Sequence, residues 1–367
     1  MNRSFNAWLS AAALICGAII LQSPTTAAPW VSAYYCSWTL TSPAPANLDL
    51  RAVTHLMFFA LKPNPDGSLS DPNATMSSSA SAVKAAAHNA GRKVLICIGG
   101  GGTAPQFESA INPSNQSTFV QNIVNWVVGN GYDGVDIDME PLSSADGPAF
   151  QSFIRNLRTA LGRKLLITVG AEPSGDATIF TPIQSDVDQI NVMTYDLSGP
   201  WSGWCSWYNS NLYSAGQIMP SNGHAMPSCD GSIENYIGAG IAPSKLAIAA
   251  AFYGTQWTGD CVPMQSITGV TVQNITYEEI ADKYYNGSNS YWDPKADASY
   301  LSLATTTNQF ISYDSQQLCK DKVDYVLKKG LGGLMCWNIG QQYCPTHPTS
   351  DQNPLLTAIY TELASRK

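Results

Sequence analysis

The segment GYDGVDIDME, residues 131–140, places acidic residues at every second position of an otherwise apolar run. Asp136, Asp138 and Glu140 alternate with valine, isoleucine and methionine. Side chains alternate along a β-strand, so the three acids share one face and the apolar residues share the other. Only 13% of the chain is charged, and the run has the hydrophobicity of a buried strand. We therefore expect the acidic face to point into the interior, with Glu140 last, at the end of the strand.

Such a group of carboxyl groups is suited to proton transfer. Desolvated carboxylates repel one another, so at least one of them should hold a proton near neutral pH. A carboxyl group that stays protonated at the mouth of a pocket can act as a general acid. Spacing of two residues on one strand favours one acid with a close helper over two carboxylates flanking a sugar. This suits a reaction in which the substrate supplies its own nucleophile. The structural alternatives are a buried salt-bridge network and a carboxylate cage for a hard cation.

The elements that must position this segment follow a regular rhythm. Eight short apolar runs alternate with helical patterns, and each run is hydrophobic almost throughout, as in strands covered on both faces. This order predicts a parallel (β/α)8 TIM barrel. A doubly wound open sheet is the second choice, but IGGGG at 98–102 lacks the spacing of its phosphate turn. The expected strands span residues 30–35, 54–60, 93–99, 134–140, 164–170, 189–195, 245–252 and 332–338, and the expected helices span residues 79–90, 118–128, 147–161, 230–238 and 319–329.

Two long segments exceed what a barrel of ~250 residues needs. One covers residues 196–230, after the sixth strand, and is rich in tryptophan. The other covers about 258–312, between the last two strands, and its Thr, Tyr and Val content predicts a small α+β insertion. Both follow strand C-termini, the face where barrel enzymes build their sites. The tryptophans are either stacking platforms for a ligand or parts of local cores: Trp38, Trp201, Trp204, Trp207 and Trp257.

The N-terminus has the pattern of a secretory signal peptide. Arg3 precedes an apolar run over residues 7–21, and small residues end at Ala28. We expect cleavage near Ala28, which leaves residues 29–367 as one catalytic barrel. The apolar run is shorter than the ~20 residues that a membrane span needs. We therefore expect a secreted, extracellular protein without a membrane segment.

The charge and the cysteines limit the partners and cofactors. The net charge of −8 and the pI near 4.9 argue against nucleic acid and anionic membranes, which call for basic patches; we expect a monomer. Eight cysteines follow the signal segment, and the exported location permits disulfides. We expect Cys205 and Cys229 to pair, and Cys97 and Cys336 to be buried thiols. With four His and no CxxC spacing, neither a metal nor another cofactor is indicated.

Several motifs together carry a family resemblance. DGVDIDME at 133–140 fits the D-G-x-D-x-D-x-E pattern of glycoside hydrolase family 18, the chitinase family. MTYD at 193–196 resembles the family's M-x-Y-D on the sixth strand. FYG at 252–254 resembles the start of its seventh-strand motif, and GGLMCW at 332–337 resembles its eighth strand. The resemblance covers nearly the whole mature chain.

The resemblance implies a role for each matching residue. Glu140 would protonate the leaving glycosidic oxygen, and Asp138 would orient the N-acetyl group of the sugar. Asp136 would share a proton or hydrogen bond with Asp138. Tyr195 would donate to the acetamido group, and Trp337 would stack under the distorted sugar. The same resemblance places the following residues at the substrate-binding wall: Tyr35, Phe59, Gly100, Met193, Asp196 and Tyr253.

Two positions depart from the family pattern. The third strand usually carries S-x-G-G, but Cys97 stands in place of the serine, and a thiol is the weaker donor. The seventh strand usually continues Y-x-R, but Thr255 stands in place of the arginine. Neither residue transfers a proton, so we expect altered subsite affinity with the chemistry intact.

The resemblance thus implies a secreted chitinase that hydrolyses β-1,4-linked N-acetylglucosamine (GlcNAc) polymers with retention of configuration. The acetamido group of the substrate would act as nucleophile and Glu140 as proton donor. Chitin and GlcNAc oligosaccharides would be the partners. One alternative is an endo-β-N-acetylglucosaminidase acting on another GlcNAc glycan. A chitin-binding lectin is the other, although such relatives typically lack the acid that Glu140 supplies here.

Overall fold

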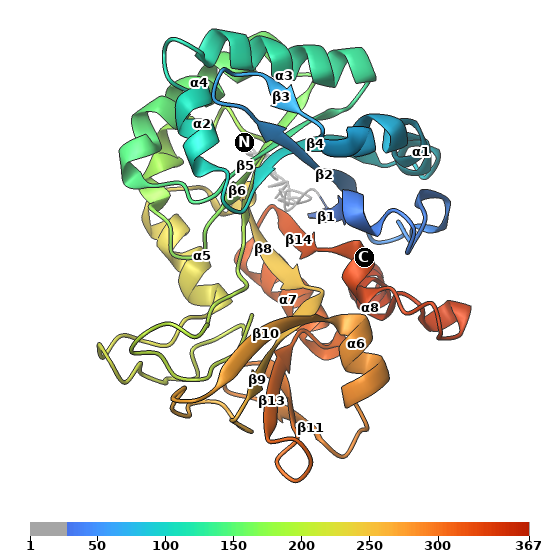
Figure 1. Cartoon of the computed structure of the whole chain (residues 1–367), viewed down its shortest axis with the longest axis vertical. Helices are drawn as coiled ribbons and strands as arrows, with labels where there is room; N and C mark the ends of the chain where they lie inside the picture. Colours follow the sequence, from blue (N-terminus) through green and yellow to red (C-terminus); the bar gives the residue numbers. More distant parts are fainter. Residues whose placement is uncertain (1–27, 367) are drawn as a thin grey trace, which may run out of the picture.

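A computed structural model describes residues 28–366, and in this range eight parallel strands close into a barrel (Figure 1). The strand order is β1-β14-β8-β7-β6-β5-β4-β2, and β2 closes the ring by pairing with β1. The predicted TIM barrel is confirmed. The strands are β1 Trp30–Cys36, β2 His55–Pro63, β4 Lys93–Gly100, β5 Gly134–Met139, β6 Leu166–Ala171, β7 Gln189–Val192, β8 Leu246–Ala251 and β14 Gly333–Trp337, and the two-residue β3, Leu69–Ser70, pairs with the end of β2.

Helices cover the outside of this barrel (Figure 1). The five expected helices are present, and α2 and α8 were not predicted. Helix α7 shows ordinary capping: at its start the Ser315 hydroxyl accepts from the Leu318 N–H at 3.3 Å, and Gly330 ends it in the left-handed conformation. The helices are α1 Thr75–Asn89, α2 Ala104–Ala110, α3 Gln116–Asn130, α4 Gly147–Leu161, α5 Cys229–Gly238, α7 Gln316–Lys329 and α8 Pro354–Ser365.

Strand β5 divides its side chains between two environments, as its sequence predicts. Val135, Ile137 and Met139 belong to the large apolar core shared with the helices. Asp136 and Asp138 belong to the opposite face, inside the barrel, and both are buried. The apolar face therefore anchors the strand, and the acidic face lies where its carboxyl groups can meet a ligand.

The insertion forms a second, antiparallel sheet beside the barrel mouth, in the lower part of Figure 1. It begins at Tyr253, directly after β8 and earlier than the expected residue 258. Buried Trp257 and Phe310 lie in its core, so Trp257 is a core residue and not a platform. The sheet order is β10-β9-β13-β12-β11, with β9 Tyr253–Thr258, β10 Thr271–Thr276, β11 Ser290–Asp293, β12 Ala298–Ser302 and β13 Gln309–Tyr313, and the short α6 spans Tyr277–Glu279.

The expected disulfide between Cys205 and Cys229 is wrong. The Cys205 sulfur lies 3.7 Å from the sulfur of Met264, in the core of the small sheet. Cys229 begins α5, and its thiol contacts the Thr194 carbonyl at 3.3 Å. All eight cysteines within the described residues are free thiols. Seven of them are buried, including Cys97 and Cys336 as predicted, and Cys261 is partly exposed.

Two further expectations concern the N-terminal segment and a membrane-spanning helix. The predicted signal segment lies outside the described residues except for Ala28, so its cleavage stays a prediction. Within residues 28–366, no helix has the length and apolar character needed to cross a bilayer.

Candidate active site

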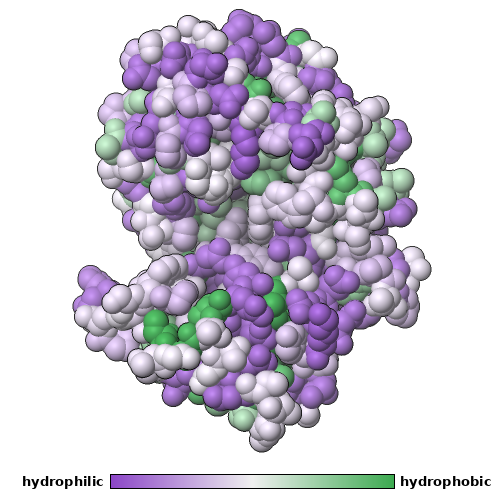
Figure 2. Space-filling model, in the orientation of Figure 1, coloured by the Kyte–Doolittle hydropathy of each residue, from purple (hydrophilic) through white to green (hydrophobic). Residues whose placement is uncertain are grey.

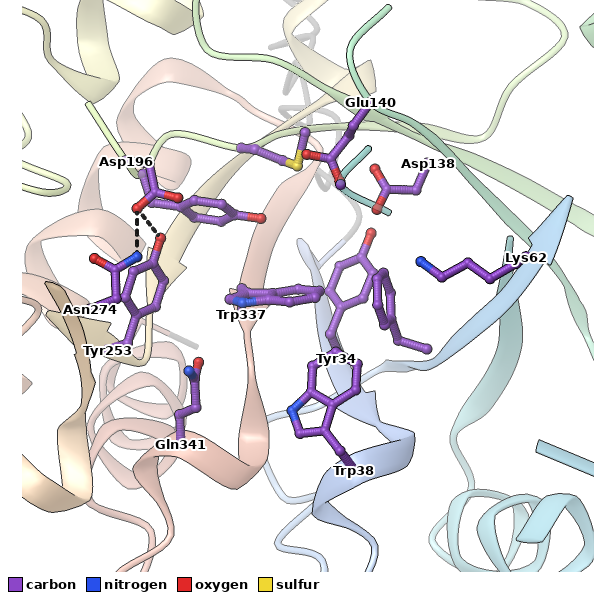
Figure 3. Close-up of a pocket in the computed structure, with 14 residues that line it drawn as sticks. Tyr34, Trp38, Lys62, Asp138, Glu140, Asp196, Tyr253, Asn274, Trp337 and Gln341 are labelled. Atoms are coloured by element: carbon purple, nitrogen blue, oxygen red, sulfur yellow. Dashed lines mark hydrogen bonds between the residues drawn. The ribbon is translucent and has the colours of Figure 1, made fainter. Parts of the chain in front are cut away.

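A pocket of about 390 Å³ opens at the C-terminal ends of the barrel strands. The surface is hollowed between the barrel and the lobe formed by the insertion (Figure 2). Side chains from both parts point into the pocket (Figure 3). The lining residues are Tyr34, Trp38, Phe59, Lys62, Gly101, Asp138, Glu140, Met193, Tyr195, Asp196, Tyr253, Asn274, Trp337 and Gln341.

Asp136 lies beneath the pocket and is fully buried. The Tyr34 hydroxyl donates to its carboxyl group at 2.7 Å, and the Thr168 hydroxyl donates at 2.5 Å. Cys97 occupies the paired position on β4. Burial raises the pKa of Asp136, and the hydrogen bonds from Thr168, Tyr34 and Cys97 oppose that rise. Tyrosine and threonine thus provide the main support for this carboxyl group, in addition to the thiol.

Asp138 lies between Asp136 and the pocket and has little exposed surface. Its Oδ1 atom is buried and has no hydrogen-bond partner in the protein. Gly170 on β6 leaves the room for it, because a Cβ there would lie 2.4 Å from Asp138 Oδ1. Burial, followed by the charges of Glu140 and Asp136, raises the pKa of Asp138 well above its usual value. The carboxyl group of Asp138 thus lines the pocket and has one buried oxygen, beside Gly170, without a hydrogen-bond partner.

Glu140 follows the last residue of β5 and is half-buried at the pocket. Burial raises its pKa, whereas a hydrogen bond with Asp138 and the positive charge of Lys62 act in the opposite direction. Figure 3 shows the two carboxyl groups of Glu140 and Asp138 next to each other. A proton held by this pair near neutral pH is what a general acid at this position requires.

Aromatic rings form the base of the pocket. Trp337 ends β14 and packs against the edges of Tyr34 and Phe59, with ring centroids 5.3 and 4.9 Å away. Trp38 lies 6.5 Å from Trp337 and is 63% exposed. These rings offer flat apolar faces of the kind that stack on sugars.

The opposite wall is polar and combines the barrel with the insertion. The Tyr253 hydroxyl donates to Asp196 at 2.7 Å, and the Asn274 amide lies 3.5 Å from the same Asp196 oxygen (Figure 3). The hydroxyl of buried Thr255 lies 3.2 Å from Asn274 Oδ1 and 3.1 Å from Asn209 Oδ1. Burial raises the pKa of Asp196. Neutral side chains therefore surround Asp196 at the place where the family pattern has an arginine.

The structure brings most of the predicted site residues together but excludes two. Tyr35 belongs to the outer core, and its hydroxyl donates to the Pro43 carbonyl at 2.7 Å. Its neighbour Tyr34 takes the place in the pocket. Gly100 does not line the pocket either, because it lies under Phe59, whose ring would be 2.5 Å from a Cβ there; Gly101 lines it instead.

Trp201 and Trp207, both in the long segment after β7, differ in solvent exposure. Trp207 is buried in the core of the small sheet, whereas Trp201 is 45% exposed and packs edge-on against Trp204 at 4.5 Å. Neither residue lines the pocket. Five pocket residues were not predicted from the sequence: Tyr34, Lys62, Gly101, Asn274 and Gln341.

Comparison with known protein families shows to which family the chain belongs. The model of the family described as Glycosyl hydrolases family 18 matches residues 31–342. The chain belongs to this family. Among its curated relatives is Endochitinase 1 of Metarhizium robertsii, 29% identical over 278 residues, or 68% of this chain and 61% of the relative. Chitinase 1 of Aphanocladium album is 27% identical, over 68% of this chain and 62% of that protein. The chain thus aligns with less than two thirds of the length of these relatives.

Solved structures of this family have the same fold. A Group IV chitinase of Ostrinia furnacalis, crystallised with allosamidin, matches with a TM-score of 0.80 over 92% of this chain and 99% of that chain, at 21% identity. A chitinase of Rhizomucor miehei matches with a TM-score of 0.76 over 92% of this chain and all of that chain, at 23% identity. The match supports the arrangement of a barrel with a small antiparallel insertion.

Proposed function

We propose that this family 18 member is a chitinase that cleaves β-1,4-linked GlcNAc polymers and oligosaccharides by substrate-assisted, retaining hydrolysis. The observation that carries the proposal is the acidic face of β5. Asp136 is hydrogen-bonded, Asp138 has an unpartnered buried oxygen, and Glu140 stands at the pocket. These three environments suit three different tasks, and the proposal requires no cofactor.

The reaction begins with the N-acetyl group of the sugar above Trp337. Its N–H donates to the carboxyl group of Asp138, and its carbonyl oxygen attacks the anomeric carbon, with support from the Tyr195 hydroxyl. The bond to the leaving oxygen breaks as Glu140 gives that oxygen a proton, and a cyclic oxazolinium forms. Water then attacks the anomeric carbon, the bond from that carbon to the acetamido oxygen breaks, and the water gives a proton back to Glu140. Two inversions at one carbon retain the β configuration, as in other substrate-assisted glycosidases.

The choice of chitin rests on the family relatives and on the shape of the site. The relatives named above are called chitinases or endochitinases. The aromatic rings of Trp38, Phe59 and Trp337 provide stacking area for a chain of sugars. An endo-β-N-acetylglucosaminidase would instead release glycans from a glycoprotein and leave colloidal chitin intact. A lectin would bind chitin oligomers without cleaving them.

The deciding experiment replaces Glu140 by Gln. We expect chitin-oligomer binding and thermal unfolding to be unchanged, while turnover falls by 10²-fold or more because the proton donor is gone. The matched control is Glu108→Gln, on an exposed position of α2, which should hydrolyse like the wild type. NMR of the first product should show the β-anomer. Wild-type turnover in Glu140→Gln, or a first product with the α configuration, would contradict the mechanism.

We also propose that the enzyme is exported and acts outside the cell. The support is the pattern of residues 1–28, with a positive start, an apolar stretch and small residues up to Ala28. The test is to express the full chain in a secreting host and sequence the N-terminus of protein from the medium. A mature chain beginning near Pro29 is expected. Protein retained in cells with Met1 intact would contradict export.

A further inference from the structure

Lys62 is a pocket residue that the proposed mechanism does not use. It lies near the end of β2 and is half-buried. Its ammonium donates to the Gly99 carbonyl at 2.7 Å and lies 5.6 Å from the centre of the Phe59 ring. In Figure 3 its side chain points into the pocket toward Asp138, on the side away from Asp196. One hydrogen bond to a carbonyl leaves other N–H donors of this ammonium free for a ligand.

Apart from tyrosines, the other ionisable side chains of the pocket are carboxyl groups. The pocket is lined by three carboxyl groups, from Asp138, Glu140 and Asp196, and Lys62 is the one Lys, Arg or His among the lining residues of the described chain. Burial raises the pKa of both Asp138 and Glu140, and the positive charge of Lys62 partly opposes that rise, which places Lys62 within electrostatic reach of the pair.

Chitin in nature is partly deacetylated, and the two kinds of sugar differ in charge. A GlcNAc unit carries a neutral acetamide whose carbonyl oxygen accepts a hydrogen bond, whereas a glucosamine unit carries an ammonium. Lys62 can donate to the first but repels the second. Lys62 and Gly101 line the same pocket, and Gly101 adds no side chain to it: a Cβ there would meet no atom within 4 Å.

We propose that Lys62 is a specificity residue that excludes deacetylated, cationic glucosamine from the subsite it faces, next to the sugar whose acetamide reacts. This inference rests on the proposed chitinase function. A purely structural role for Lys62, in holding the Gly99 carbonyl, would give no preference between acetylated and deacetylated units. The preference, not the overall rate, is therefore what must be measured.

The first experiment digests partially deacetylated chitin with wild type, Lys62→Met and Lys62→Arg, followed by sequencing of the product ends. The reacting unit must be acetylated in every case, so the comparison concerns its two neighbours. In Lys62→Met we expect the ratio of glucosamine to GlcNAc at one of these two neighbouring positions to rise on the order of tenfold. The reason is the loss of like-charge repulsion, acting over several ångströms, between Lys62 and the glucosamine ammonium. Lys62→Arg keeps the charge and should keep most of the selectivity. The control Lys295→Met removes an exposed lysine of the insertion and should behave as wild type.

The second experiment measures binding and does not depend on hydrolysis. In the Glu140→Gln background, fully acetylated and partly deacetylated hexamers are compared by tryptophan fluorescence with and without Lys62→Met. We expect the affinity ratio of the two hexamers to fall on the order of tenfold when the lysine is removed. If the wild type cleaves no GlcNAc polymer, the proposed function fails, yet this binding ratio still tests Lys62. An unchanged ratio together with unchanged product ends would overturn the inference.

Discussion

Gly170→Ala tests whether the position of Asp138 matters as much as its presence. Gly170 lies on β6 beside the acidic face of β5, and a Cβ there would lie 2.4 Å from Asp138 Oδ1. The backbone of Gly170 is not in the left-handed region reserved for glycine. The added methyl group therefore acts on the carboxyl group and not through backbone strain.

The expected size of the effect follows from this distance. Ordinary contact between a methyl carbon and an oxygen is about 3.4 Å, so Asp138 must withdraw its oxygen by about 1 Å. A displacement of about 1 Å in a catalytic arrangement costs on the order of 10²-fold in rate. Because Asp138 would hold the acetamide during attack, we expect kcat to fall about 10²-fold while KM changes much less.

The assay is steady-state hydrolysis of GlcNAc oligomers, with thermal unfolding measured in parallel. The control is Gly238→Ala, since a Cβ at that helical position meets nothing within 4 Å; it should keep wild-type kcat and gain slight stability. A Gly170→Ala variant with intact fold and wild-type kcat would refute the reasoning that Asp138 must stay where the structure places it. A variant that merely unfolds would be identified by its lowered melting temperature.

Two further predictions concern charges. The charge of Lys62 opposes the rise that burial causes in the pKa of Glu140, so Lys62→Met should raise that pKa further. Glu140 would then stay protonated to higher pH, and the alkaline limb of the kcat/KM profile should move to higher pH. A move to lower pH would contradict this. Lys322 and Asp314 form a fully buried ion pair at 2.6 Å, so Lys322→Ala should destabilise the fold by about 3–5 kcal/mol in chemical denaturation, because Asp314 is left unpaired. The double variant Lys322→Met/Asp314→Leu should lose less, and an equal or larger loss would exclude this explanation.

The orientation of the acidic strand could be predicted because its acidic and apolar residues lie on opposite faces. Three acids at alternate positions of residues 134–140 fix which side chains face inward, and the structure places Asp136 and Asp138 there. Strand β1 has no such alternation of acidic and apolar residues to distinguish its two faces. Tyr34 and Tyr35 are both aromatic and both buried, so hydrophobicity does not distinguish the pocket face from the outer core. The assignment of Tyr35 to the pocket failed for this reason.

Other pocket residues could not be predicted because tertiary structure brings them in. Lys62 follows the apolar run expected to end at residue 60, but β2 continues to Pro63 and carries the lysine to the pocket. Asn274 comes from β10 of the insertion, far along the chain from Asp196, which it meets. The insertion was expected from composition, but its composition does not tell which side chain reaches the barrel.

The unpartnered oxygen of Asp138 connects the fold to the proposed reaction. Buried polar atoms are normally hydrogen-bonded, and leaving one without a partner costs about 1–3 kcal/mol. Asp136, one pleat deeper on the same face, has donors from Tyr34 and Thr168, so the barrel interior is able to supply them. At Asp138 the neighbouring strand instead offers Gly170, which provides space and no donor. A bound acetamide N–H would remove that cost once the Asp138 carboxyl group turns toward it, so a GlcNAc oligomer should raise the melting temperature more than a glucosamine oligomer of equal length.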